Sequence, residues 1–146
     1  MDKFNNFLPD EYKIFTLFYD ERVIFYINDK KLVRDNLTTD CLAFIETITL
    51  DEDDEMCISW IATNTGYKRK GLASMLIIAA TEYYKNKSQV VLDDCSDYAF
   101  IESNIYTLLG FKYINSNEPE MIGKPSTIIK KWKSFINKYG KRQFYN

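Results

Sequence analysis

The sequence predicts an α/β or α+β domain in which helices flank a mixed sheet and a basic helix lies at the C-terminal end. Three observations support this class. Apolar, β-rich runs fill the first part of the chain, strand and helix patterns alternate in its middle, and a well-punctuated helix pattern follows residue 124. With 146 residues, 46% of them apolar, the chain can bury one substantial core, and we expect a single domain over residues 1–146.

The first half of the chain contains three expected strands and one ambiguous segment. Residues 12–20 are aromatic and β-branched between turn residues, which predicts a strand. Residues 41–50 and 55–63 predict an antiparallel hairpin with an exposed acidic turn. In residues 21–35 the apolar positions fit a helix face, but the unbroken apolar run also fits a buried strand. The sequence does not decide the secondary structure of this segment, and a helix is slightly preferred.

The second half alternates between the two patterns. A helix begins at Leu72, and its buried face is expected to comprise Leu72, Met75, Leu76, Ala79 and Tyr83. A second helix is expected from about residue 98 to Leu109, with Gly110 at its C-terminal end. Further elements are expected at 88–94 (strand), 111–114 (strand), 120–124 (strand) and 125–140 (helix, opened by proline and closed by glycine). The succession 55–63, 72–84 and 88–94 is a strand–loop–helix crossover to a further strand.

Composition excludes several classes of enzyme. The chain contains no histidine, which removes Ser-His-Asp and Cys-His catalysis and argues against a zinc enzyme. Three widely spaced cysteines fit a reduced protein without a disulfide framework. The N-terminal residues lack the features of a signal peptide, and no run of 18 apolar residues occurs. We therefore expect a cytoplasmic or nuclear protein that is not secreted and has no membrane partner.

Charge is distributed unevenly along the chain. The net charge is −2, yet residues 121–146 carry seven cations and no acid. This basic tail would suit a nucleic acid, but a solvated helix face lying against an acidic body explains it better.

Three cations, Lys68, Arg69 and Lys70, stand with Gly71 directly before the helix at Leu72. Free N–H groups and the helix dipole make a helix start a favourable anion site, and a glycine lets the anion approach the backbone. The loop matches neither the Walker pattern nor the three-glycine dinucleotide pattern, so ATP and NAD are disfavoured.

Two short motifs resemble the signatures of the GNAT superfamily of N-acetyltransferases. "YKRKGLASML" resembles its pyrophosphate loop, with Lys68, Gly71 and Ala73 in the three pattern positions. "NIYTLLGFKYI" resembles its second signature, in which Tyr106 stands four residues before a Gly-Phe pair. The motifs lie about 35 residues apart in the family's order. Lys68 replaces the usual Gln or Arg and loses the planar fork of arginine.

The resemblance implies a splayed sheet that binds acetyl-CoA between the strand ending near Ala62 and the strand at 88–94, with no metal. An open strand edge could pair with the amides of the pantetheine arm, and the helix start could hold the pyrophosphate. The residues implied in cofactor binding are Ile61, Ala62, Thr63, Lys68, Arg69, Lys70, Gly71, Leu72, Ala73, Ser74 and Asn104.

The implied reaction is direct attack of a primary amine on the thioester in a ternary complex, with positioning as the main source of rate. Tyr106 is the expected acid that protonates the departing thiolate. The base stays open among Glu46, Glu55, Asp93, Asp94 and water. Cys95 has no histidine to activate it and is expected to be inert.

The acceptor, a small molecule or a protein, is not determined by the sequence, and a homodimer stays open. Two alternatives to an enzyme also remain. The first is a non-catalytic CoA-binding regulatory module on the same fold. The second, less favoured, is a nucleic-acid-binding domain that uses the basic tail.

Overall fold

A mixed seven-stranded sheet forms the centre of the molecule in the computed structural model, which describes residues 8, 11–32, 40–49, 54–64, 66, 71–93 and 105–139. Its order is β1-β2-β3-β4-β5-β7-β6. The strands are β1 (Lys13–Tyr19), β2 (Arg22–Asn28), β3 (Ala43–Thr49), β4 (Glu55–Thr63), β5 (Gln89–Asp93), β6 (Lys112–Tyr113) and β7 (Glu120–Gly123). Neighbouring strands are antiparallel except β4 and β5, which are parallel.

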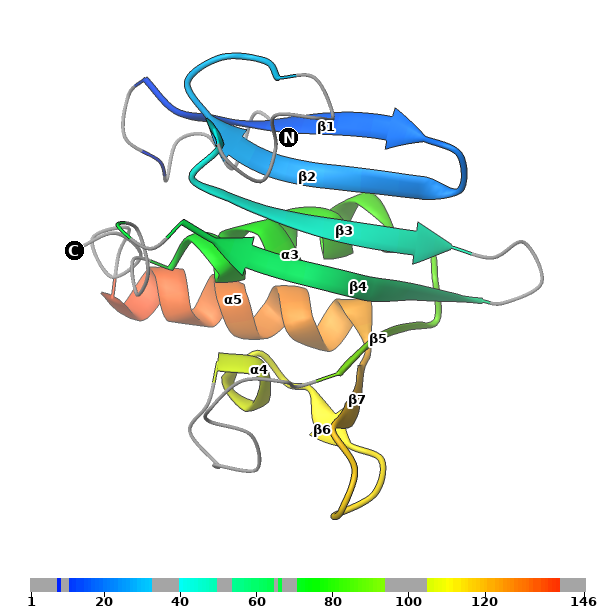
Figure 1. The fold of residues 1–146 in the computed structure, drawn as a ribbon. Coiled ribbons are helices and arrows are strands. Elements are labelled where there is room, and N and C mark those ends of the chain that lie inside the picture. The colour runs from blue at the N-terminus through cyan, green and yellow to red at the C-terminus, as the bar shows by residue number, and fades with distance from the viewer. Residues whose placement is uncertain are drawn as a thin grey trace.

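The expected crossover is confirmed. Strand β4 leads into helix α3 (Leu72–Tyr83), and the chain returns along β5 parallel to β4. Helix α4 (Ile105–Leu108) precedes β6, and helix α5 (Pro125–Tyr139) follows β7. Helices α3 and α5 lie behind the sheet on one face in Figure 1. The predicted helix at 98–109 is described only from Ile105, so its first part lies outside the described residues.

The preference for a helix in residues 21–35 was wrong, because residues 22–28 form β2. Strand β2 pairs with β1 on one side and with β3 on the other, and residues 23–28 are all buried. Val23 and Ile27 belong to the main core, whereas Ile24 belongs to a smaller cluster on the opposite face. Burial of both faces removes the alternation that usually identifies a strand.

Helix α3 is buried over more of its circumference than one face. Residues 74–81 are all buried, because the helix lies across the sheet and also packs against α5. Tyr83 was wrongly placed on the buried face: it is 49% exposed at the end of the helix, with its ring against Phe18 and Phe25.

Helix α5 packs against the main core as expected. Ile128 and Trp132 are buried and Ile129 is partly buried, while the side chains of residues 135–139 lie outside the description. No helix in the described parts of the chain is long and apolar enough to cross a bilayer.

Candidate active site

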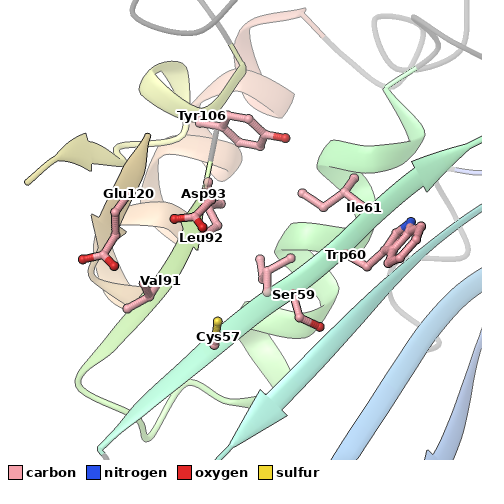
Figure 2. Close-up of a pocket in the computed structure, with 10 residues that line it drawn as sticks. Cys57, Ser59, Trp60, Ile61, Val91, Leu92, Asp93, Tyr106 and Glu120 are labelled. Carbon is pink, nitrogen blue, oxygen red and sulfur yellow. The ribbon is translucent and has the colours of Figure 1, made fainter. Parts of the chain in front are cut away.

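Strands β4 and β5 separate at the centre of the sheet. They pair from Glu55 to Ile58, but β4 continues to Thr63 without a partner on β5. A cavity of about 620 Å³ lies where they part (Figure 2). Its lining comprises Cys57, Ile58, Ser59, Trp60, Ile61, Val91, Leu92, Asp93, Tyr106 and Glu120. The predicted splay is therefore present, and beyond Ile58 no described strand pairs with this edge of β4.

A β-bulge in β4 lies beside this cavity. Glu46 of β3 stands opposite Trp60 and Thr47 stands opposite Ile58, so Ser59 is an extra residue without a partner. The bulge shifts the phase of the strand, which is why Ile58 and Ile61 both contact the main core. It also places Trp60 at the surface, 60% exposed, where it lines the cavity.

Side chains from two neighbouring strands hold the bulge. The hydroxyl of Ser59 lies 3.1 Å from Oε1 of Glu46 and 3.3 Å from its carbonyl oxygen. The same Oε1 forms a salt bridge with Nη1 of Arg22 on β2. Glu46 was a candidate base, but its carboxylate is already engaged and it does not line the cavity.

Tyr106 lies at the start of α4 on the side of the cavity opposite β4, and its ring points across towards Ile61 (Figure 2). The backbone around it forms a compact turn. The carbonyl oxygen of Tyr106 accepts hydrogen bonds from the N–H groups of Leu109 and Phe111, at 3.2 and 3.0 Å. Gly110 has a φ of 96°, as a left-handed helix end requires.

The Gly-Phe pair therefore has a structural role in orienting the tyrosine. The ring of Phe111 is fully buried and packs edge-on against the ring of Tyr106, with centroids 6.3 Å apart. The motif noticed in the sequence is thus one folded unit rather than three separate residues.

The start of α3 is where the sequence predicts an anion site. Gly71 is the N-cap residue with φ 77° and ψ 11°, and no side chain caps the first turn. Leu72 and Ser74 are buried and Ala73 is partly exposed, so the backbone is the part of this turn best placed to meet a ligand. The predicted cofactor residues Lys68, Arg69, Lys70 and Asn104 lie outside the described residues.

On the open edge of β4, Ile61 lines the cavity but Ala62 and Thr63 do not. Both of the latter pair with β3, opposite Phe44 and Ala43. Ala62 packs against the smaller cluster on the far face from the main core. Of the three predicted pantetheine contacts, the structure thus brings one side chain into the cavity.

Among the other candidate bases, Asp93 lines the cavity. Glu55 sits at the paired end of β4, where its Oε2 accepts a hydrogen bond from Nε2 of Gln89 at 2.6 Å. Asp94 and Cys95 lie outside the described residues. Of the candidate bases that the structure describes, only Asp93 lines the cavity.

Seven of the ten lining residues were missed from the sequence, and Cys57 and Glu120 are the two of them that carry titratable groups. The thiol of Cys57 points into the cavity (Figure 2), and its pKa is raised by burial and then by the charges of Asp93, Glu55 and Glu120. Glu120 begins β7, and only the strand order places it beside β5. The described residues contain no group of three or more His, Cys, Asp or Glu arranged to hold a metal ion.

The comparisons with known proteins agree with this geometry. The model of the acetyltransferase (GNAT) family matches residues 2–111. The chain belongs to the GNAT family of acetyltransferases. Among curated protein sequences, none matches this chain.

Solved structures share the fold of this GNAT chain. One is the PaiA N-acetyltransferase of Thermoplasma acidophilum in complex with coenzyme A, with TM-score 0.52, 15% identity and coverage of 71% of this chain. The chain spans 61% of that enzyme's length. Another is a mutant AtaT toxin bound to the C-terminus of the antitoxin AtaR, with TM-score 0.58, 11% identity and coverage of 82% of this chain and 96% of that one. A third, the KacTA–DNA complex, has TM-score 0.56, 11% identity and coverage of 80% and 76%.

Proposed function

We propose that this protein is an acetyl-CoA-dependent N-acetyltransferase that acts on a primary amine in a ternary complex. The cavity between the separated ends of β4 and β5, with Tyr106 across it, carries the proposal. Membership of an acetyltransferase family supports it, and so does the coenzyme A bound to the structurally similar Thermoplasma enzyme.

The open edge of β4 suits the pantetheine arm. Beyond Ile58 this edge has no partner in the described parts of the chain, and its backbone groups would pair with the arm's amides as an added strand would. The start of α3 would receive the pyrophosphate, because Gly71 has no side chain and the described residues give this turn no side-chain cap hydrogen bond. Lys68, Arg69 and Lys70 precede that turn in the sequence and would add positive charge.

The chemistry then follows from the groups around the cavity. The amine nitrogen forms a bond to the acetyl carbon, and the bond from that carbon to sulfur breaks. Asp93 or a water takes the proton from the amine, and the hydroxyl of Tyr106 gives a proton to the thiolate. Holding the two reactants in line can supply on the order of 7–11 kcal/mol, so positioning contributes more than either proton transfer.

Thermal unfolding in the presence of coenzyme A tests the proposal. A ligand that binds only the folded state stabilises it by about 2.7 kcal/mol at a hundredfold excess over its Kd, so the Tm should rise. Gly71→Ala should shrink this CoA-dependent rise, because the new methyl group crowds the backbone donors, and should lower the basal Tm because φ is 77°.

Gly66→Ala provides the matched control in the same loop. A Cβ at Gly66 would meet no atom within 4 Å, so this variant should keep the CoA-dependent rise. An unchanged Tm of the unsubstituted protein at millimolar coenzyme A would refute the proposed function. A clear rise without turnover over a broad amine panel would instead identify a non-catalytic CoA-binding module.

A further inference from the structure

Two acidic residues that line the cavity come from neighbouring strands. Asp93 ends β5 and Glu120 begins β7, and the two residues are direct partners in the antiparallel ladder. Direct partners point to the same face of a sheet, and like charges in such a pair are destabilising. Both residues are exposed and both line the cavity. Neither carboxylate forms a salt bridge or a side-chain hydrogen bond with another described residue.

The rest of the described lining lacks a compensating cation. It contains no lysine or arginine, and it presents the aromatic rings of Trp60 and Tyr106. Lys112 of β6 pairs with Ile122, which is two residues from Glu120 and on the same face of β7, but Lys112 forms no salt bridge with Glu120. The thiol of Cys57 lines the same cavity, and its pKa is raised first by burial and then by the nearby charges of Asp93, Glu55 and Glu120.

A cavity lined by carboxylates and aromatic rings favours a cationic ligand over an anionic one. We propose that the acceptor carries a second positive charge besides its reacting amine, as an aliphatic diamine or polyamine does, and that Glu120 binds this remote ammonium while Asp93 faces the reacting one. This inference rests on the proposed function. In this proposal Glu120 serves in recognition and Asp93 in proton transfer. The two roles would account for a pair of like charges at facing positions of β5 and β7.

The test compares three acceptors of equal chain length with acetyl-CoA and the full chain. They are 1,5-diaminopentane, pentylamine and 5-aminopentanoate, which end in an ammonium, a methyl group and a carboxylate. We expect kcat/KM, measured by thiol release, to fall in that order. Glu120→Gln should raise KM for the diamine roughly fivefold with little change in kcat, as for loss of an exposed ion pair worth about 1 kcal/mol. It should leave pentylamine unaffected.

Two further variants sharpen the experiment. Glu120→Lys should move the preference from the diamine towards 5-aminopentanoate. Glu118→Gln is the matched control, because Glu118 is exposed two residues before Glu120 but does not line the cavity. This variant should leave kcat/KM for all three acceptors unchanged. Equal kcat/KM for all three acceptors, or a Glu120→Gln variant with unaltered selectivity, overturns the inference.

The inference and the proposed function fail in distinguishable ways. If coenzyme A raises the Tm but none of the three amines is acetylated, or all are acetylated equally, the acceptor assignment is wrong while cofactor binding stands. If coenzyme A leaves the Tm unchanged, the proposed function itself is wrong.

Discussion

Tyr106 is the residue whose chemical role can be separated most cleanly from its structural one. Its backbone closes the turn before β6 and its ring packs on Phe111, and both contacts survive in Tyr106→Phe. If the hydroxyl protonates the thiolate, this variant should keep its fold and its affinity for coenzyme A while kcat falls by about 10²-fold or more. The measurements are the Tm and the steady-state rate of thiol release.

The opposite result has a distinct pattern. If the hydroxyl only satisfies a buried hydrogen bond, Tyr106→Phe should cost about 1–2 kcal/mol of stability and keep its turnover. Full activity in a destabilised variant would therefore remove Tyr106 from the reaction and leave water as the proton donor.

Glu46 shows how a neighbour can exclude a residue from a role. From the sequence both Glu46, in the central hairpin, and Asp93, at the end of the next strand, were candidate bases. In the structure the carboxylate of Glu46 lies between Arg22 and Ser59, where it holds the bulge. Because these contacts hold the Glu46 carboxylate and Glu46 does not line the cavity, Asp93 is better placed for proton transfer.

The turn between α4 and β6 depends on one glycine for two reasons. Gly110 has a φ of 96°, and a Cβ there would lie 3.0 Å from Cγ2 of Thr127 on α5. Gly110→Ala should therefore lower the free energy of unfolding by roughly 1–3 kcal/mol, through backbone strain and overpacking. Because the same turn orients Tyr106, turnover should fall as well.

Chemical denaturation of Gly110→Ala and Gly66→Ala provides the measurement for this turn. Gly66 has open space around its Cα, so its variant should unfold within about 0.5 kcal/mol of the unsubstituted protein. Equal stabilities of the two variants would show that the turn tolerates a side chain at Gly110.

The main core joins residues from distant parts of the chain into one unit. It extends from Leu8 to Trp132 and includes residues of β2, β3, β4, α3, β5, β7 and α5. Helix α5 is therefore expected to be part of the folded body rather than an appendage. Ile128 is fully buried, and its Cδ1 lies 3.0 Å from the position of a Cβ at Gly123.

Ile128→Ala should destabilise the whole molecule. Removing a buried isoleucine side chain leaves a cavity and typically costs about 2–5 kcal/mol. Ile129→Ala, one residue along the helix and only partly buried, should cost less. Unfolding by denaturant measures both, with a single transition expected. A helix that could be altered at Ile128 without loss of stability would instead support the alternative in which the basic tail serves a nucleic acid, detectable as strongly salt-dependent oligonucleotide binding.

The sequence predicted those structural features that depend on residues close together in the chain. Periodicity predicted the hairpin of β3 and β4, the crossover through α3 and the helix α5, and all three are confirmed. The turn at Gly110 was also predicted, because a left-handed helix end selects glycine locally. These features need no information about distant residues.

Only the tertiary structure decided the features that depend on strand order. The apolar pattern of β2 slightly favoured a helix because both faces of this strand are buried. One face packs in the main core and the other in the smaller cluster, and β1 and β3 pair with its two edges. Glu120 gains its place in the cavity because β7 inserts between β5 and β6. Side-chain periodicity shows which residues of a segment are buried. It does not show which other segments bury them, because that depends on packing between residues far apart in the chain.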